Sequence, residues 1–540
     1  MKNIKPCILA LTGIALTCLS RESAAADDHS ACGELRFDAG RLLMERHPSK
    51  ALNVDDNLRG LREGMVPDYA VANVVKWLEL MGVDMSDYRR THKFVEPKAG
   101  PLARDFRVSY MLDISRDKVP TMDTLKTIVD VLAAAGFGEL QLYTEHTFAY
   151  AAHAEVWRDC SPMTAAELHE LDDYAWAKGV RLVPNQNSFG HLEKWLQHEK
   201  YREALAETPG GYTIDNPRLV NRPPCAICPT NPKSVDFLAG LYDELLPNFR
   251  HAREINVGCD EVWDIFDSHG RSAAVAAKIG VPRLYMHHLL NVHSLLKRRG
   301  WRMAFWADMV LRDPELLDSV PKDVNALQWG YGCEWDCRGY TCEFEGRCLA
   351  LRRRGIPFTV CPSTLTYRGP FFDLKDSFGN IRLAAESAAK FGAEGLLLTE
   401  WGDGGHPNAF LANLPQIVCA GLLCRNQPAD DAAIAAKIDQ IAGAKIGESL
   451  IALWSTRRRR GDELDIGSMR RSLDAALGAA CAAPAWVRNG LALADLHLRA
   501  KEAAAANAPL PEGLREQYRR LWLEANRPGG LDASIRARKY

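Results

Sequence analysis

The chain has 540 residues, of which 47% are hydrophobic and 25% charged, the composition of an ordinary globular protein. Its formal net charge of −2 at pH 7 argues against nucleic acid or an anionic membrane surface as a partner. The length exceeds one ordinary domain, although a single (β/α)8 barrel can take about 250 residues or more.

The first 26 residues have the features of an export signal peptide. Lys2 and Lys5 give a positively charged start, residues 7–19 form an apolar core, and the alanines at 24–26 supply a small-residue cleavage site. The apolar core is short for a membrane span, and no other stretch is long and apolar enough. We therefore expect a soluble exported protein, periplasmic or secreted, whose mature form begins near Asp27.

Fifteen cysteines are present, two of them in the expected signal. An oxidising compartment permits disulfides, and clustering in two loops favours disulfide-stapled loops. The clustered cysteines are Cys225 and Cys228 in one loop, and Cys333, Cys337, Cys342 and Cys348 in the other. A zinc site is the alternative, but no paired Cys-x-x-Cys repeat or nearby histidine pair supports it. Cys259 and Cys361 lie in apolar strand contexts and are expected to be core thiols.

Residues 27–104 form a first segment of unclear fold. From residue 105, apolar runs of strand length alternate with helix-like segments. The expected strands are residues 109–114, 140–143, 180–184, 255–257, 303–306, 326–329, 358–361 and 395–399. The expected helices are residues 122–135, 165–178, 234–246, 283–299, 343–354, 381–391 and 414–424, with a weak one near 314–320.

Eight strands alternating with helices predict an α/β fold, a (β/α)8 TIM barrel over residues 105–426. A doubly wound sheet is the competing arrangement, but no Gly-x-Gly-x-x-Gly follows the first strand. Residues 427–540 have no strand pattern and are rich in Ala, Leu and Arg. We expect them to form a helical extension packed on the barrel.

Polar and aromatic residues stand at the carboxyl ends of the expected strands, where barrels of this kind carry their chemistry. In chain order they are Asp113 and Arg116; Tyr143, Glu145 and His146; Asn185, Gln186, Asn187 and His191; Asp260 and Glu261; Trp306 and Asp308; Trp329 and Tyr331; Thr364 and Tyr367; Trp401, Asp403 and His406. Each alone is explained by packing, capping or ion pairing. Packing, capping and ion pairing do not explain why three tryptophans and several acids stand together at the ends of different strands. Aromatic walls with carboxylates and amides suit a sugar ring, which has apolar faces and a hydroxyl edge.

The adjacent acids Asp260 and Glu261 supply two carboxyl groups beside one bond, as glycoside cleavage requires. Residues 257–261, Val-Gly-Cys-Asp-Glu, resemble the Gly-x-Asp-Glu signature of glycoside hydrolase family 20, the β-N-acetylhexosaminidases. The similarity continues in order through residues 111–116, 142–146, 187–191, 305–308 and 399–403, and it covers residues 105–426.

This resemblance implies a retaining, substrate-assisted reaction, in which the 2-acetamido oxygen of the sugar attacks the anomeric carbon. It implies that Glu261 acts as acid and then base, and that Asp260 accepts the acetamido N–H. The substrate-binding residues it implies are Arg107 with Arg116 as the fallback, Glu145, His191, Trp306, Trp329, Tyr367, Trp401 and Asp403.

Within that set, the resemblance implies that the three tryptophans wall the sugar and that Tyr367 donates to the acetamido oxygen. Asp403 is expected to bind the outer hydroxyls, and Glu145 and His191 to support Glu261. The implied substrate is a glycan with a terminal GlcNAc or GalNAc, and neither a metal nor an organic cofactor is expected. No expectation follows for the oligomeric state.

The sequence departs from the family pattern at three points. Arg107 stands one residue too far from Asp113, Cys259 replaces a commoner glycine, and the first segment is shorter than the family's leading α/β domain. Two alternatives stay open: another retaining glycosidase on the same barrel, or a carbohydrate-binding protein on a catalytically dead barrel. The latter would be marked by loss of one carboxylate of the pair, and both are present.

Overall fold

The computed structural model describes residues 75, 78, 83–91, 100–116, 118–216, 218–313, 316–332, 344–455 and 464–538. The expected signal peptide, most of the first segment, and Cys333, Cys337 and Cys342 lie outside these residues. The domain boundaries at 104 and 426 stay predictions.

The described chain contains one sheet of eight parallel strands. They are β1 (Arg107–Asp113), β2 (Glu139–Tyr143), β3 (Arg181–Val183), β4 (Glu254–Asn256), β5 (Arg302–Trp306), β6 (Asn325–Trp329), β7 (Phe358–Cys361) and β8 (Gly395–Glu400). Their order is β3-β2-β1-β8-β7-β6-β5-β4. Every expected strand overlaps an observed one, because strands of a parallel sheet are buried on both faces and read as continuous apolar runs.

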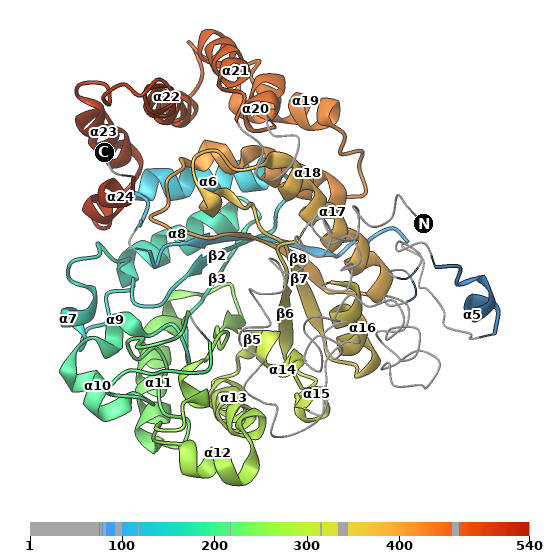
Figure 1. Cartoon of the computed structure of the whole chain (residues 1–540), viewed down its shortest axis with the longest axis vertical. Helices are drawn as coiled ribbons and strands as arrows, with labels where there is room; N and C mark the ends of the chain where they lie inside the picture. The colour runs from blue at the N-terminus through green and yellow to red at the C-terminus, as the bar shows by residue number, and fades with distance from the viewer. Residues whose placement is uncertain are drawn as a thin grey trace.

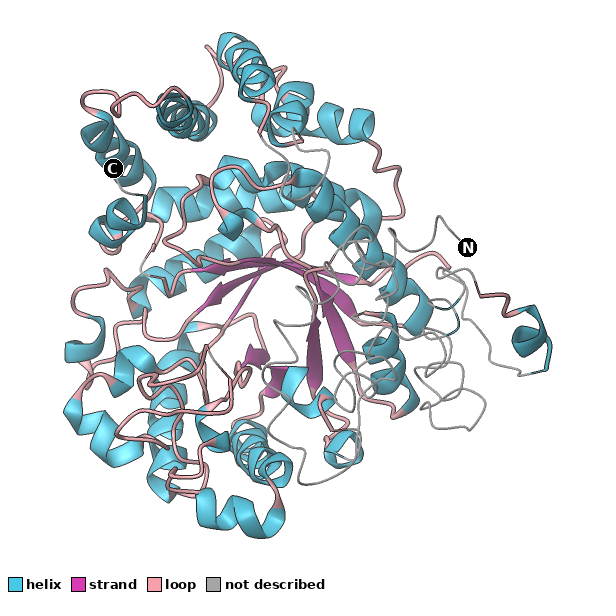
Figure 2. Cartoon of the chain, in the orientation of Figure 1, coloured by secondary structure: helices cyan, strands magenta, loops and turns pink. Residues whose placement is uncertain are grey.

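The two ends of this order meet and close the sheet. Asn185, just after β3, pairs in parallel with Asn256 at the end of β4. The Asn256 amide donates to Pro184 O and the Gln186 amide donates to Asn256 O, both at 3.0 Å. The predicted (β/α)8 barrel is therefore confirmed, and Figure 2 shows the strands at the centre with helices around them.

The longer helices of the barrel match the expected ones. They are α6 (Met122–Ala134), α8 (Ala165–Ala177), α11 (Pro232–Leu245), α13 (Val281–Arg298), α16 (Glu345–Arg353), α17 (Leu374–Phe391) and α18 (Leu414–Cys424). Local signals set their starts. Thr164 forms a capping box with Glu167 at α8, and the Asp373 side chain accepts the Lys375 amide at α17.

Shorter elements connect them. These are α5 (Ser86–Thr91), α7 (Ala154–Trp157), α9 (Glu193–Leu196), α10 (Glu199–Leu205), η4 (Leu246–Asn248), η5 (Asp264–Phe266), α12 (Ala273–Ile279), α14 (Asp308–Leu311), α15 (Leu316–Ser319), η6 (Thr366–Arg368) and η7 (Phe410–Asn413). No helix in the described part of the chain combines the length and the apolar character needed to span a bilayer.

After the barrel, the described residues form α19 (Asp431–Ala442), α20 (Gly447–Trp454), α21 (Ile466–Ala479), α22 (Ala485–Ala505), α23 (Leu514–Ala525) and α24 (Leu531–Arg538). Figure 1 shows α22, α23 and α24 in red on the same side of the barrel as α6. Arg527 fixes this contact: its amide donates to Val119 O at 2.8 Å, and its guanidinium lies 2.8 Å from Glu167. The end of the chain is thus joined to the segment that follows β1.

The described cysteines carry free thiols. The expected disulfide in the loop of Cys225 and Cys228 is therefore wrong. A carboxylate holds this loop instead: Asp264 accepts the Cys225 thiol at 2.6 Å and the Cys225 amide at 3.0 Å. Cys259 and Cys361 are buried free thiols, as expected.

Candidate active site

The backbone after β4 turns so that two neighbouring acids reach one place. Gly258, Cys259 and Glu261 have φ of 67°, 71° and 47°, in the left-handed region. Neighbours on a regular strand would point to opposite faces. Here the His191 Nε2 atom lies 3.4 Å from Asp260 Oδ2 and 3.8 Å from Glu261 Oε2. Both carboxylates therefore border the same site.

Groups from neighbouring strands hold this left-handed turn. The Trp306 amide donates to Gly258 O at 3.0 Å, and the Tyr285 hydroxyl donates to Cys259 O at 2.8 Å. Asp308 Oδ2 accepts the Glu261 amide at 3.3 Å. From the sequence, Asp308 stands at a strand end and has no assigned role. In the structure its carboxylate binds the backbone of the acid pair.

Gly258 is required by space as well as by conformation. A Cβ atom there would lie 2.1 Å from Asn187 Oδ1, in addition to the strain of its positive φ. We expect Gly258→Ala to lower the free energy of unfolding by about 2 kcal/mol and to lower activity roughly a hundredfold by displacing the acid pair. Urea unfolding and steady-state kinetics measure the two effects.

Gly138→Ala is the matched control, because a Cβ atom there meets nothing within 4 Å and the φ is not positive. Its free energy of unfolding should stay within about 0.5 kcal/mol of the parent value. Equal behaviour of the two variants would contradict the strained, crowded turn at Gly258.

His191 is the cation between the acids. Burial lowers its pKa, but the carboxylates of Asp260 and Glu145 more than offset burial, so the pKa of His191 stands well above its ordinary value. The imidazolium is therefore the form at neutral pH. The Glu261 side chain is 44% exposed, and its partial desolvation among crowded groups raises its pKa; the charges of Asp260 and Asp403 raise the pKa further against the opposing effect of His191. Glu261 is thereby suited to hold a proton.

Two further acids keep protons near neutrality. Burial raises the pKa of Glu145 to about 7, although the cations of Arg116 and His191 oppose the shift. Burial together with the charges of Asp260 and Glu261 raises the pKa of Asp308 to about 7. Acids whose pKa values are raised towards 7 by burial and by neighbouring charges are typical of sites that carry out acid–base chemistry near pH 7.

Arg116 lies inside this set of charges. Its Nη1 atom is 3.0 Å from Asp113 Oδ2 and 3.2 Å from Glu145 Oε1, and its Nη2 atom is 3.4 Å from Asp403 Oδ1. Its guanidinium also stacks on the rings of Tyr143 and Trp401, at 5.3 and 5.7 Å from the centroids. The fallback arginine is thus the one that the fold brings to the site.

Arg107 is not brought to this site, and its assignment as a sugar ligand is corrected. It begins β1, whereas Asp113 ends it, so the two lie about 20 Å apart along a strand that rises about 3.3 Å per residue. Arg107 pairs instead with Glu254 at 3.0 Å and Glu394 at 3.3 Å. It is a structural cation at the amino end of the barrel.

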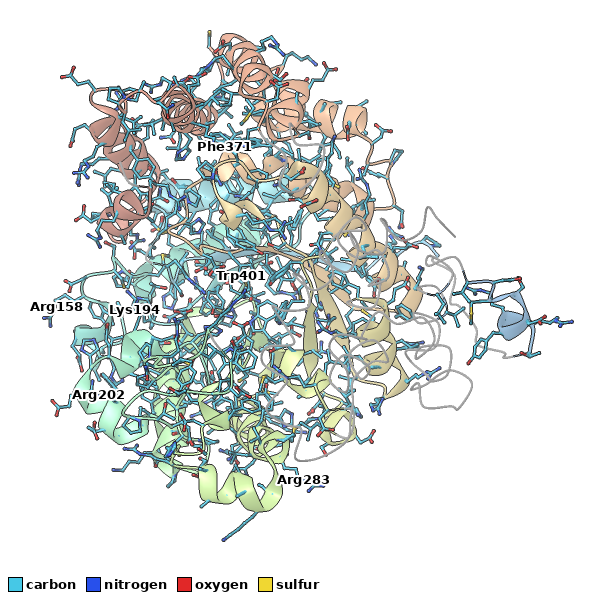
Figure 3. The ribbon with its side chains drawn as sticks, in the orientation of Figure 1. Arg158, Lys194, Arg202, Arg283, Phe371 and Trp401 are labelled. Carbon is cyan, nitrogen blue, oxygen red and sulfur yellow. The ribbon has the colours of Figure 1, made fainter. Side chains whose placement is uncertain are left out.

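The predicted aromatic residues form one cluster with two further tyrosines. Its members are Trp306, Trp329, Trp401, Tyr367, Tyr143 and Tyr331. Ring centroids are 5.8 Å apart for Trp306 and Trp401, and 5.2 Å apart for Trp329 and Tyr331. Figure 3 shows Trp401 near the middle of the molecule, beside the strands.

Tyr331 was not among the predicted ligands, although it stands two residues after Trp329. Its hydroxyl accepts the Trp401 indole N–H at 2.7 Å, and its ring centroid lies 6.4 Å from that of Tyr367. The predicted Tyr367 therefore has a second tyrosine ring beside it in the same cluster.

Four of the buried polar atoms that lack a hydrogen-bond partner lie at or just after the carboxyl ends of β4, β5 and β6. They are Trp306 Nε1, Trp329 Nε1, Asp260 Oδ1 and Asp308 Oδ1. Two are donors and two are acceptors. Trp306 and Trp329 belong to the aromatic cluster itself, and Asp260 and Asp308 follow β4 and β5. Because buried polar groups in native proteins are nearly always paired, these atoms indicate a ligand that offers both donors and acceptors. A hydroxylated ring bearing an amide does so.

Fold and site together define a (β/α)8 barrel with an aromatic cluster and paired acids at its carboxyl end. Residues 106–334 match the model of the glycosyl hydrolase family 20 catalytic domain. This part of the chain belongs to glycoside hydrolase family 20.

Two curated relatives are similar over part of their length. Hexosaminidase D of Homo sapiens is 23% identical over 342 residues, which cover 60% of this chain and 66% of that protein. Hexosaminidase D of Bos taurus is 26% identical over 226 residues, which cover 41% of this chain and 62% of that protein. The chain thus spans slightly less than two thirds of the length of these relatives.

Solved structures show the same kind of likeness at low identity. A chitobiase of Flavobacterium johnsoniae aligns with a TM-score of 0.49 and 15% identity, covering 82% of this chain and 71% of that one. A β-N-acetylhexosaminidase of Bacteroides fragilis aligns with a TM-score of 0.45 and 19% identity, and the alignment covers 63% of this chain and 70% of that one.

Proposed function

We propose that this protein is an exo-acting, retaining β-N-acetylhexosaminidase that removes terminal GlcNAc or GalNAc from glycans. The observation that carries the proposal is the left-handed turn, which places Glu261 and the unpaired Oδ1 of Asp260 beside the aromatic cluster. A carboxylate oxygen with no protein partner suits the N–H of an acetamido group. Membership of family 20 and two relatives named hexosaminidase support the same activity.

The reaction follows from these positions. The acetamido oxygen of the substrate forms a bond to the anomeric carbon as the glycosidic bond breaks, and Glu261 gives its proton to the leaving oxygen. Asp260 accepts the acetamido N–H and stabilises the positive charge that develops on the resulting oxazolinium ring. Glu261, now a base, takes a proton from water, which adds to the anomeric carbon and opens the ring with retention.

Surrounding groups prepare this chemistry. The tryptophan wall excludes water, which strengthens the electrostatic interactions inside it. His191 lies 3.4 Å from Asp260 and orients this carboxylate. Arg116, held by three carboxylates, and Asp403 are the proposed partners of the outer sugar hydroxyls.

The decisive experiment compares hydrolysis of aryl β-N-acetylglucosaminide, β-N-acetylgalactosaminide and β-glucoside by the purified protein, with Glu261→Gln as the blank. Cleavage of the acetamido sugars alone, with inhibition by a thiazoline mimic of the oxazolinium, is the expected result. Cleavage of the plain glucoside would favour a retaining glycosidase with a carboxylate nucleophile. Binding of GlcNAc without cleavage of any substrate would favour a carbohydrate-binding barrel.

The charges around Glu261 predict two opposite shifts in the pH profile. The basic limb of kcat/KM reports loss of the proton from the catalytic acid. Asp403 raises the pKa of Glu261 and His191 lowers it. Asp403→Asn should therefore move the basic limb to lower pH, and His191→Gln should move it to higher pH. Shifts in the same direction would contradict the assignment of Glu261 as the acid.

We also propose that the protein is exported and that its mature chain begins near Asp27. The basic start, apolar core and alanine-rich end of residues 1–26 support this. Amino-terminal sequencing of the protein from a periplasmic or culture fraction tests it. An intact Met1 in the active protein would contradict it.

A further inference from the structure

The loop of residues 402–408 follows β8 and carries Asp403. Its first amide, that of Gly402, donates to Asp113 Oδ2 at 2.9 Å, and the same carboxylate oxygen lies 3.0 Å from Arg116. The loop therefore borders the charges around Arg116, and Asp403 reaches Arg116 from it at 3.4 Å. What fixes this loop fixes one side of the proposed sugar pocket.

Five consecutive carbonyl oxygens of this loop, those of residues 404–408, accept hydrogen bonds from side chains outside it. The donors are Arg538 Nη2 to Gly404 O, Ser534 Oγ to Gly405 O, Lys118 Nζ to His406 O, His497 Nε2 to Pro407 O, and Lys118 Nζ to Asn408 O. Most carbonyl groups in proteins are paired with backbone amides. Five consecutive carbonyl groups paired with distant side chains indicate that contacts with other parts of the chain determine the conformation of this loop.

The backbone of the loop explains why outside donors are needed. Gly404, Gly405 and His406 have φ of 69°, 89° and 50°, so the segment cannot form a regular helix or strand. Such a conformation persists only where its surroundings determine it. A Cβ atom on Gly405 would lie 3.3 Å from Ser534 Cα, so α24 packs directly on this glycine.

The C-terminal helices supply three of the five hydrogen bonds. His497 belongs to α22, and Ser534 and Arg538 belong to α24. His497 and Ser534 are buried, 3% and 1% exposed. The Tyr518 hydroxyl of α23 lies 2.8 Å from Ser534 Oγ, which itself donates to Gly405 O at 2.6 Å. All three helices thus converge on the loop.

We propose that α22 and α24 position the Asp403 loop against Arg116, which makes the C-terminal helical region a working part of the sugar-binding site. Ser534, Arg538 and His497 are positioning residues: they act on the sugar through the loop backbone and Asp403. The role of Asp403 toward the sugar rests on the proposed hexosaminidase function, whereas the fixing of the loop does not.

Ser534→Ala and Arg538→Met test the proposal in the full chain, with Arg536→Met as the matched control. Arg536 lies on the same helix and is exposed. Amide hydrogen exchange over residues 402–408 should become faster in the first two variants and stay unchanged in the control. Unchanged exchange in this segment would overturn the proposal, whatever the protein's activity.

Steady-state kinetics then show whether the C-terminal helices position Asp403 or only pack against the barrel. Each of the two variants should lose roughly tenfold in kcat/KM for the aryl N-acetylhexosaminide. In an Asp403→Ala background the same substitutions should cause no further loss, because they act through Asp403. A full additional loss in that background would overturn the assigned route. If the parent protein cleaves no acetamido sugar, the proposed function fails, and hydrogen exchange still decides this inference.

Discussion

Replacing Glu261 by glutamine is expected to lower kcat/KM for substrates with poor leaving groups by roughly 10²- to 10⁴-fold. An amide cannot give up a proton to the departing oxygen, whereas its size and hydrogen-bonding capacity are close to those of the acid. The effect should shrink for an aryl leaving group that departs without protonation. Parallel assays on alkyl and dinitrophenyl N-acetylglucosaminides measure the difference, and calorimetry should find sugar binding retained.

Glu170→Gln is the control for this substitution. Glu170 stands on the outer helix α8, pairs with Lys126 and is 54% exposed, so its loss should leave both substrates unaffected. Unchanged turnover of the alkyl glycoside by Glu261→Gln would remove Glu261 from the mechanism. An equal loss on both substrates would point instead to a misplaced site.

The barrel was predictable because its strands carry their signal locally. Runs such as residues 395–399 are apolar on both faces and short, which separates them from helices. Closure of the barrel was not visible in the same way. Closure depends on the pairing of Asn185, which follows β3, with Asn256, which ends β4. Both strands are short and both residues are polar, so no local sequence pattern marks this pair.

The candidate site was predictable where motifs follow strands directly, as Asp260 and Glu261 follow β4. The prediction for Arg107 failed because it was carried over from the family resemblance, although Arg107 precedes the expected strand 109–114 and so stands at its amino end. Arg107 and Asp113 are the first and last residues of β1. Arg116, three residues beyond Asp113, follows the strand end and meets Glu145 and Asp403.

Features that depend on distant partners were missed. The thiols of Cys225 and Cys228 suggested a disulfide, because the sequence does not reveal that Asp264 holds Cys225. The same is true of Asp308, whose bond to the Glu261 amide joins the segments after β5 and β4. Cys259 stands where the family commonly has glycine, and its φ of 71° lies in the left-handed region that favours glycine, which the sequence does not reveal.

Asp260 should be almost as sensitive to substitution as Glu261, for an electrostatic reason. Its side chain is 10% exposed, its Oδ2 atom lies 3.4 Å from the His191 imidazole, and its buried Oδ1 atom has no partner. Asparagine would keep the shape of the residue and could still accept one hydrogen bond. It would remove the negative charge that faces the positive charge developing on the acetamido group.

We expect Asp260→Asn to lower kcat by roughly 10²- to 10³-fold with a smaller change in KM, since the lost interaction is strongest in the transition state. Affinity for a thiazoline inhibitor should fall in parallel, whereas affinity for GlcNAc should change less. Asp267→Asn is a matched control: Asp267 is equally buried, at 7% exposed for the whole residue, but its carboxylate accepts the amides of Thr213 and His269. That variant should lose stability and keep the kcat of its folded fraction. A raised KM with unchanged kcat in Asp260→Asn would mean that Asp260 binds the sugar without taking part in the reaction, and the substrate-assisted mechanism would lose its second carboxylate.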